Sequence, residues 1–138
     1  MITPAEVDAF VAEHFPSAHV QGLRCEALGD GFAVARWHFD DATLRPGGLI
    51  SGPTQFALVD TALWFLAFTV LGLVPMSVTS DVHIVFLRPA AGADLLARAE
   101  LLRAGRSRIS GQVSVWVEGE EDRPVSHATG SYALLETR

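Results

Sequence analysis

The feature that most constrains this chain is a long apolar segment that contains a single charge. Between Arg45 and Asp81 the only charged residue is Asp60, which lies inside the largely apolar stretch 54–71. Gly52-Pro53 precedes this stretch, and proline favours the first turn of a helix because its φ is already helical and its missing N–H is not needed there. We therefore predict a long apolar helix with Asp60 about two turns from its start.

A carboxylate in this position requires an explanation. An ionised group resists transfer to an apolar interior by several kcal/mol, whereas each buried Leu, Phe or Val returns about 1.5 to 3 kcal/mol. The apolar neighbours of Asp60 can therefore hold one unfavourable charge in place. Its retention indicates either a functional carboxylate or a structural one bonded to nearby backbone or hydroxyl groups.

Composition limits the class of protein. With 138 residues, 49% of them hydrophobic, the chain is the size of one compact domain, and we predict a single domain spanning 1–138. The formal net charge is −6, and all ten basic residues are arginine. Nucleic-acid binding draws its affinity from clustered cations, so we predict no nucleic-acid partner. Local arginines could still hold a small anionic ligand.

The cysteine count and the N-terminal charges suggest a compartment. Cys25 is the only cysteine, so no intrachain disulfide can form, and Glu6 and Asp8 stand where a signal peptide would carry positive charge. We therefore expect a cytoplasmic protein. Residues 56–74 approach the length of a membrane span, but Asp60 interrupts them and no basic cluster flanks them, so we predict no membrane partner.

Local patterns predict an α+β fold. Thr3 is a candidate N-cap and Pro4 a first helical residue for a short helix over 5–15. Strands are predicted by alternation and turn residues, and 95–102 is assigned as strand from its context. The predicted strands are 20–28 and 31–39, which form a hairpin before the long helix, and then 77–86, 95–102, 109–117 and 125–135, in meander order.

A helix that is apolar on all sides must be covered on all sides. One sheet can cover only one side of a cylinder about 10 Å wide. We therefore predict that a second copy of the chain covers the remainder, in a homodimer or a homotetramer built as a dimer of dimers. Pairing of edge strands across a two-fold axis would also protect the sheet edges.

Several motifs together resemble a known family. Gly52 precedes Asp60-Thr61-Ala62 by eight positions, and VTSDVHIVFLRPA at 78–90 and AGRS at 104–107 follow. In order and spacing, over roughly 45–132, these motifs resemble the hotdog-fold acyl-CoA thioesterases of the phenylacetate-degradation (PaaI-like) type. The resemblance implies an antiparallel sheet wrapped around one long central helix. It also implies hydrolysis of an acyl-CoA or related thioester, with coenzyme A as part of the substrate and no other cofactor.

The resemblance assigns three catalytic residues. Asp60 matches the catalytic acid, which acts as nucleophile or general base, and Gly52 matches the glycine whose N–H polarises the thioester carbonyl. Thr79 matches a hydroxyl residue that positions water, and the opposing subunit is expected to complete the site. The helix start offers the N–H groups of Gly52, Thr54 and Gln55 as donors at the positive end of the helix dipole.

Three positions depart from the family pattern. Ser51 stands where histidine is common, Pro53 replaces a second glycine, and Arg45 occupies a position often held by asparagine. A guanidinium near Asp60 would stabilise its anion and reduce its basicity. We predict that Arg45 and Ser51 contact the substrate.

Other arginines are candidates for the phosphates of coenzyme A. Arg88, Arg106 and Arg108 could form charge-assisted hydrogen bonds with them, although solvated turn charges explain the same residues. The five histidines, the single cysteine and the scattered acids show no metal-ligand spacing, so we predict no metal site.

Histidines and aromatic residues have simpler explanations. His83 and His127 lie on alternating strands, where a solvated or hydrogen-bonded side chain is expected. Trp64, Phe65 and Phe68 on the long helix are predicted to be core residues and not an acyl pocket.

Two alternative functions remain open. A non-catalytic acyl-CoA-binding protein would use the same pocket and is favoured by the changes at Arg45 and Ser51. A hotdog hydratase or dehydratase would pair a histidine with its acid. Because no histidine lies between His38 and His83, that reaction would need a histidine from elsewhere in the fold.

Overall fold

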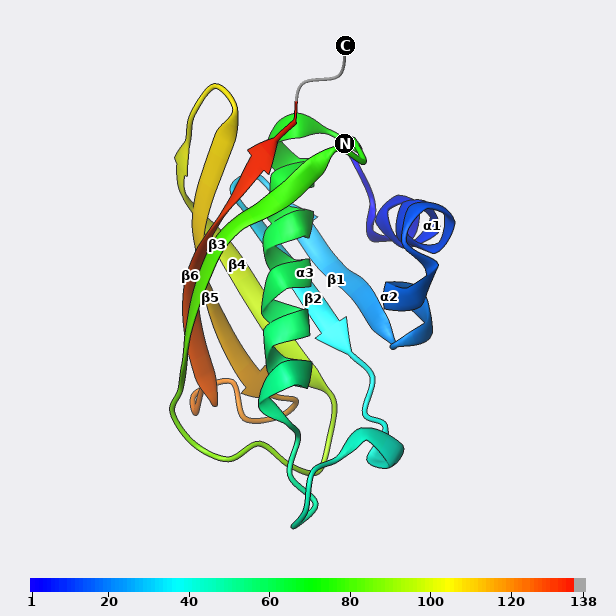
Figure 1. The fold of residues 1–138 in the computed structure, drawn as a ribbon, viewed down its shortest axis with the longest axis vertical. Helices are drawn as coiled ribbons and strands as arrows, with labels where there is room; N and C mark the ends of the chain where they lie inside the picture. Colours follow the sequence, from blue (N-terminus) through cyan, green and yellow to red (C-terminus); the bar gives the residue numbers. More distant parts are fainter. Residues whose placement is uncertain (136–138) are drawn as a thin grey trace.

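A computed structural model, which describes residues 1–135, has the predicted α+β architecture. One six-stranded antiparallel sheet curves around the central helix α3, and the short N-terminal helices lie beside β1 (Figure 1). The elements in chain order are α1 (Pro4–His14), α2 (Pro16–Val20), β1 (Leu23–Gly29), β2 (Phe32–Trp37), the 3-10 turn η1 (Asp41–Thr43), α3 (Gly52–Leu71), β3 (Ser77–Phe86), β4 (Leu95–Ala104), β5 (Arg108–Val117) and β6 (Ser126–Leu134).

The N-terminal helix begins where the sequence predicts. Thr3 accepts a hydrogen bond from the Glu6 N–H at 3.2 Å, and Glu6 accepts one from the Thr3 N–H at 3.2 Å, so the two form a reciprocal capping box. The predicted start of the first strand is wrong. Pro16 begins α2, and the first strand begins at Leu23 and not at residue 20, after Gly22 turns the chain with a φ of 86°.

The order of the strands also differs from the predicted meander. The sheet runs β1-β2-β4-β5-β6-β3, so β3 pairs with β6 at the far edge and not with β4. The pairing extends from Ser77 opposite Leu134 to Phe86 opposite Ser126. Alternation along a strand identifies which face it buries, but it does not identify its neighbours, and this is why the order could not be read locally.

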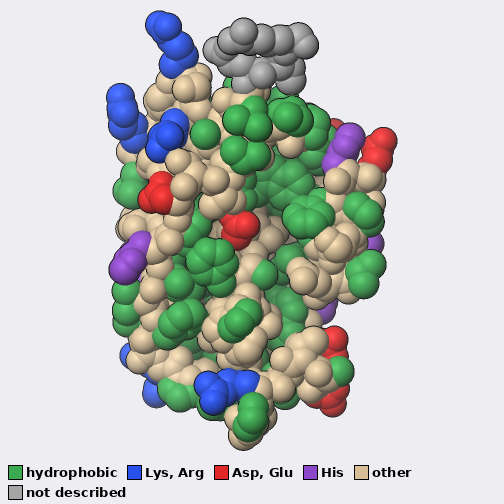
Figure 2. Space-filling model, viewed as in Figure 1, with side chains coloured by type: hydrophobic (Ala, Val, Ile, Leu, Met, Phe, Trp, Pro, Cys, Tyr) green, Lys and Arg blue, Asp and Glu red, His purple; other side chains and the backbone are tan. Residues whose placement is uncertain are grey.

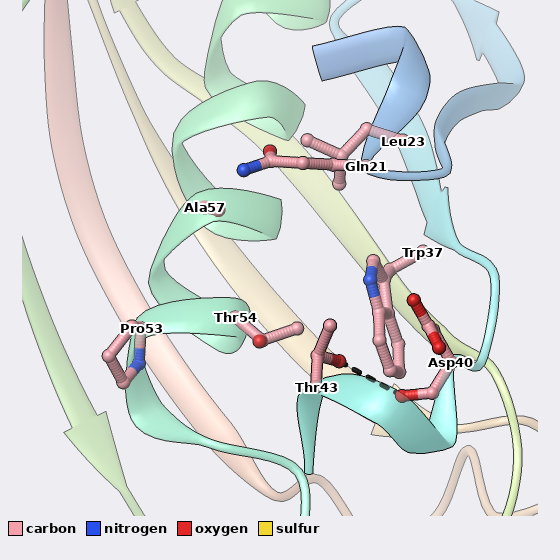
Figure 3. Close-up of a pocket in the computed structure, with 8 residues that line it drawn as sticks. All are labelled: Gln21, Leu23, Trp37, Asp40, Thr43, Pro53, Thr54 and Ala57. Carbon is pink, nitrogen blue, oxygen red and sulfur yellow. Dashed lines mark hydrogen bonds between the residues drawn. The ribbon is translucent and has the colours of Figure 1, made fainter. Parts of the chain in front are cut away.

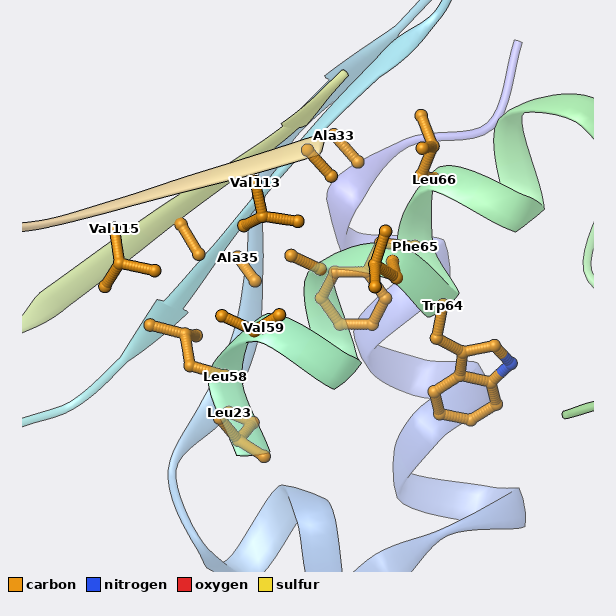
Figure 4. Packing of buried hydrophobic residues seen from close by; sticks show 14 of the residues in the cluster. Leu23, Ala33, Ala35, Leu58, Val59, Trp64, Phe65, Leu66, Val113 and Val115 are labelled. Atoms are coloured by element: carbon orange, nitrogen blue, oxygen red, sulfur yellow. The ribbon is translucent and has the colours of Figure 1, made fainter. Parts of the chain in front are cut away.

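The core forms where α3 lies against the sheet, and α3 contacts all six strands. Figure 4 shows part of this core, where residues of α3 pack against residues of β2 and β5. Two glycines permit this close approach. Gly111 and Gly130 are direct partners on β5 and β6, and a Cβ on either would lie 2.6 Å from a methyl of Leu66 or Leu63, respectively. The missing side chains therefore leave room for the leucines of α3.

The sheet covers one side of α3, and α1 covers part of the other. The Phe10 ring lies 5.3 Å from that of Phe68 and 6.3 Å from that of Trp64. α3 is long and apolar enough to cross a membrane, but 61% of its most apolar 18-residue window is buried inside the protein. This burial supports a core helix.

Part of α3 remains uncovered in the single chain. Figure 2 shows mainly hydrophobic side chains over this face, with an acidic side chain among them. We call this surface the α3–β3 face; it includes Phe56, Val78 and Phe86, which are 40 to 51% exposed. Coverage of the α3–β3 face by a second copy stays a prediction.

Candidate active site

Asp60 is the centre of the candidate site. It lies on α3 with a partly exposed side chain, and its Oδ1 accepts hydrogen bonds from the Thr79 hydroxyl at 2.6 Å and the Tyr132 hydroxyl at 2.7 Å. Tyr132 also lies 3.0 Å from the backbone carbonyl oxygen of Asp60. Within residues 1–135, no hydrogen bond reaches Oδ2. The two donors therefore orient the carboxylate and leave its second oxygen available.

The sheet brings the two donors together. Thr79 on β3 and Tyr132 on β6 are direct partners, and directly paired residues place their side chains on the same face of a sheet. A β-bulge follows Thr79, and bulges re-aim the side chains around them. The pair therefore meets Asp60 from one side of α3.

Tyr132 is a residue of the candidate site that the sequence analysis missed. It is 5% exposed, and burial together with the neighbouring Asp60 carboxylate raises the pKa of its hydroxyl well above the ordinary value. Tyr132 therefore stays protonated and acts as a donor. The sequence contained a clue to this role, because the single tyrosine of the chain lies on a predicted strand. A buried tyrosine hydroxyl needs a hydrogen-bond partner.

The start of α3 offers fewer free donors than predicted. The Ser51 hydroxyl accepts the Thr54 N–H at 3.2 Å, and the Ser51 carbonyl accepts the Gln55 N–H at 3.1 Å. These bonds use two of the three predicted donors, so that prediction is wrong for Thr54 and Gln55. The Gly52 N–H has no hydrogen-bond partner among residues 1–135. Ser51 is an N-cap, and its contact with substrate stays a prediction.

Asp60 lies between two hollows. We call the first the α1-side cavity; it has a volume of about 520 Å³ and is lined by His14, Phe15, Asp60, Thr61, Trp64, Pro75, Ser77, Val78, Thr79 and Tyr132. We call the second the Gly52 groove; it has a volume of about 600 Å³ and is lined by Gly52, Pro53, Phe56, Ala57, Asp60, Ile84 and Phe86. Among the described residues, Asp60 alone lines both.

A smaller hollow of about 190 Å³ lies beside the first turns of α3 (Figure 3). Pro53 and Ala57 line it as well as the Gly52 groove, but Asp60 does not. Thr43 and Asp40 on its wall are joined by a 2.9 Å hydrogen bond from the Thr43 hydroxyl to the Asp40 carbonyl.

Within the part of the chain that the structure describes, no three His, Cys, Asp or Glu side chains are grouped to hold a metal ion.

Arg45 does not pair with Asp60 within one chain. It lies in the loop before α3, where its backbone N–H donates a hydrogen bond to the Leu49 carbonyl at 2.9 Å. Among residues 1–135, Asp60 forms no ion pair within 4.0 Å. The expected stabilisation of the Asp60 anion by Arg45 is therefore not seen inside the single chain.

The other predicted arginines lie at opposite ends of the sheet. Arg108 is opposite Ala133, close to the start of β3, whereas Arg88 follows the end of β3 and donates to the Pro124 carbonyl at 2.6 Å. β3 is ten residues long, or about 33 Å at 3.3 Å per residue. Arg106, two residues before Arg108, is therefore too far from Arg88 for both to bind one phosphate in a single chain.

The predicted core aromatics divide into two groups. Phe65 and Phe68 are at most 1% exposed and belong to the core, as predicted. Trp64 is 9% exposed and also lines the α1-side cavity, so its assignment to the core alone was incomplete.

A helix wrapped by an antiparallel sheet, with a carboxylate held at its exposed side, defines a protein of the hotdog class. Residues 47–123, more than half of the chain, match the thioesterase superfamily. The chain belongs to this superfamily.

Solved structures agree with this assignment. The chain is 31% identical to a putative thioesterase from Silicibacter sp. TM1040, with 99% of this chain and 94% of that one covered and a TM-score of 0.87. It is 25% identical to the phenylacetic acid degradation protein PaaI from Thermus thermophilus, with 87% and 99% covered and a TM-score of 0.74. A thioesterase from Haemophilus influenzae, 20% identical with 99% and 92% covered and a TM-score of 0.83, shares the fold. No curated protein matches the sequence.

Proposed function

We propose that this protein hydrolyses acyl-CoA or a related thioester and that Asp60 is its catalytic carboxylate. The observation that supports the proposal is the hydrogen bonding of the two carboxylate oxygens of Asp60. One oxygen is held by Thr79 and Tyr132, while the other is free between two hollows. Fixed orientation of a reacting group lowers the entropic cost of reaching the transition state.

Two chemical routes use the free oxygen. In the first, Oδ2 takes a proton from a water molecule, whose oxygen attacks the thioester carbonyl carbon. In the second, Oδ2 attacks that carbon directly, and water then hydrolyses the resulting anhydride. In both routes the carbonyl electron pair moves to oxygen, the Gly52 N–H donates to this oxyanion, and its collapse breaks the C–S bond and releases the thiolate, which then takes up a proton.

The proposed roles have typical magnitudes. A positioned base contributes about 10²- to 10⁴-fold in rate, and one oxyanion donor contributes about 2.7 to 4 kcal/mol. Because the Thr79 hydroxyl donates its proton to Asp60, it would hold a water molecule as an acceptor.

A second copy of the chain is part of the proposal. Gly52 and Asp60 are eight residues apart, or about 12 Å along α3, whereas one thioester carbonyl must approach both groups within about 3 Å. Gly52 adjoins Phe86 at the end of β3, and Thr79 lies near its start. Antiparallel pairing of two β3 edges would therefore bring Gly52 of one chain towards Asp60 of the other.

The test is thiol release from a series of short, medium, long and aryl acyl-CoA thioesters, with Asp60→Asn beside the wild type. We expect the variant to remain folded and to lose at least about 10²-fold in turnover. Asp81→Asn removes an exposed carboxylate from β3 and serves as the matched control. Equal turnover in Asp60→Asn and wild type would exclude Asp60, and thioester binding without thiol release would identify an acyl-CoA-binding protein.

One observation favours a hydratase or dehydratase as a second candidate. His14 lines the α1-side cavity together with Asp60, which supplies the histidine that the sequence alone did not place there. Its ring is partly exposed and packs against that of Phe10, tilted by 40° with centroids 4.3 Å apart. Hydration of an enoyl-CoA, followed by absorbance, distinguishes this candidate from thioester hydrolysis.

A further inference from the structure

A further hollow lies beside the last turns of α3. We call it the Gly72 cavity; it has a volume of about 540 Å³ and is lined by Met1, Ile2, Leu28, Gly29, Asp30, Phe68, Thr69 and Gly72. Much of this wall is apolar. Met1 and Ile2 precede α1, whereas His14 and Phe15, which line the α1-side cavity, lie at its end. The Gly72 cavity and the α1-side cavity therefore lie at opposite ends of α1.

Three aromatic rings separate the two cavities. Trp64 lines the α1-side cavity and Phe68 lines the Gly72 cavity, and their ring centroids are 5.0 Å apart. The Phe10 ring of α1 lies 6.3 Å from the first and 5.3 Å from the second. Figure 4 shows Trp64 on the side of α3 that faces away from Val113 of β5. Aromatic rings at such distances are in contact, so these three rings, which we call the aromatic partition, close the passage between the cavities.

Phe10 is the member of the aromatic partition that α1 needs least. Its side chain is partly exposed, whereas Val7 and Val11 are at most 1% exposed and anchor α1 in the core. The Asp8 carboxylate adds a second anchor, because it accepts a hydrogen bond from the Cys25 backbone N–H of β1 at 2.8 Å. Removal of the Phe10 ring is therefore expected to open the aromatic partition without releasing α1.

The charges around Asp60 indicate which hollow receives each end of a thioester. Asp60 lies between the α1-side cavity and the Gly52 groove, so the acyl group and the coenzyme A arm of one thioester extend into different hollows. Among the described residues, no arginine lines the α1-side cavity, whereas Arg88 lies two residues after Phe86 of the Gly52 groove. Phosphates form their strongest hydrogen bonds with cations. This arrangement favours coenzyme A on the side of the Gly52 groove and the acyl group in the α1-side cavity.

We propose that the acyl group lies in the α1-side cavity and that the aromatic partition ends this site, with Phe10 as a specificity-determining residue. This inference rests on the proposed function and adds a substrate class, the thioesters of short acyl groups. Trp64 is four residues after Asp60 and Phe68 is eight, or about 6 Å and about 12 Å along α3. A zigzag chain with bonds of about 1.5 Å advances about 1.3 Å per carbon, so the aromatic partition begins near the fifth carbon and the Gly72 cavity near the ninth.

The test measures kcat/KM for thiol release from butanoyl-, hexanoyl-, octanoyl- and decanoyl-CoA in the wild type and in Phe10→Ala. In the wild type we expect kcat/KM to rise as far as hexanoyl-CoA and to gain nothing from longer chains. In Phe10→Ala the decanoyl-to-hexanoyl ratio should rise by at least about 10-fold, because each newly buried methylene contributes about 4-fold. An unchanged ratio, or equal changes for all four thioesters, would overturn the proposal.

Phe15→Ala is the matched control. The Phe15 ring also contacts Trp64, with centroids 6.2 Å apart, but it lines the α1-side cavity and not the Gly72 cavity. Its removal widens the first cavity without joining the two, so the decanoyl-to-hexanoyl ratio should stay at the wild-type value. An equal gain in Phe15→Ala and Phe10→Ala would assign the effect to the width of the α1-side cavity and would contradict the role of the aromatic partition.

A second substitution tests where the longer chain lies. Thr69 lines the Gly72 cavity, so Thr69→Phe in the Phe10→Ala background places a ring where the end of a decanoyl chain is expected. The decanoyl-to-hexanoyl ratio should then return to the wild-type value. A ratio that stays high in the double variant would place the longer chain outside the Gly72 cavity and would overturn the proposal.

A binding experiment separates this inference from the proposed function. Non-hydrolysable thioether analogues with hexyl and decyl chains on coenzyme A are titrated against the wild type and Phe10→Ala by calorimetry. If the wild type releases no thiol from any thioester, but Phe10→Ala gains affinity for the decyl analogue alone, then hydrolysis is wrong and the aromatic partition holds. If thiol is released but Phe10→Ala changes the affinity for both analogues equally, the aromatic partition alone is overturned.

Discussion

The hydroxyl of Tyr132 contacts Asp60 twice, 2.7 Å from the carboxylate oxygen Oδ1 and 3.0 Å from the backbone carbonyl oxygen. These contacts tie β6 to the middle of α3 at the point where chemistry is proposed. Tyr132 touches no substrate atom in the proposed reaction, so we regard it as a positioning residue.

Tyr132→Phe should lower kcat by about 10- to 100-fold with a smaller change in KM, because a carboxylate that turns away by about 1 Å loses this much in rate. Steady-state kinetics over a series of thioesters measure both constants. Ser131→Ala is the control, because the adjacent Ser131 hydroxyl bonds Ser110 at 3.0 Å and not Asp60. A fall in KM and kcat together, or none, would argue against positioning.

Gly52→Pro should lower kcat by about 10²- to 10³-fold, because it removes the N–H proposed to bind the oxyanion. Gly52→Ala keeps this N–H and adds a Cβ about 3.3 Å from the Phe86 ring, so it controls for crowding. Comparable loss in the two variants would assign the effect to crowding.

Mixing the Gly52→Pro chain with the Asp60→Asn chain tests whether two copies share a site. If they do, random dimers regain about a quarter of the wild-type activity, because half are mixed and each mixed dimer has one intact site. Mixing two differently tagged Asp60→Asn chains should regain nothing. A Gly52→Pro and Asp60→Asn mixture that stays inactive, although mixed dimers are recovered by their tags, would place the whole site in one chain.

Gly130→Ala should destabilise the fold by about 1 to 3 kcal/mol, the cost of overpacking a close-packed core. The added Cβ would lie 2.6 Å from a Leu63 methyl and 2.8 Å from the Asp81 carbonyl oxygen, and the backbone cannot yield easily. Denaturant unfolding measures the difference. Thr129→Ala, on the exposed face of the same strand, should change stability by less, and equal losses would contradict this account.

The stability of the protein should fall as the pH rises above about 9. Burial, with a smaller contribution from the Asp8 carboxylate, raises the pKa of the Cys25 thiol from 9.0 to about 12. Between these values the unfolded chain loses a proton that the folded chain keeps, so the free energy of unfolding falls by about 1.4 kcal/mol per pH unit. Denaturant titrations at pH 8 and pH 10 measure it, and Cys25→Ala should reduce the dependence. If the pH dependence of stability in Cys25→Ala equals that of the wild type, a group other than Cys25 causes it.

The sequence predicts the elements well because their signals are local. Gly52-Pro53 and the capping residue Thr3 mark helix starts, and alternation marks most strands. The resemblance also directs attention to Asp60 and Thr79, which the structure brings to hydrogen-bonding distance.

The features that were missed depend on contacts between distant segments. Tyr132 reaches Asp60 only because β6 pairs with β3, and the close approach of α3 depends on Gly130 lying opposite Gly111. The helix-start donors were overcounted because the Ser51 hydroxyl and carbonyl oxygens are aimed back into the first turn. No local pattern specifies these relationships.

The position of β3 at the sheet edge also imposes an order of assembly. A ribosome produces β3 before β4, β5 and β6, yet within residues 1–135 its sheet partner is β6, the last strand to emerge. During synthesis the nascent chain must therefore carry Thr79 on an unpaired strand. The side of α3 that packs against β4, β5 and β6 is uncovered until these strands are made. Such exposed intermediates are prone to aggregation, and Asp60 gains its two donors only when the C-terminal strand inserts.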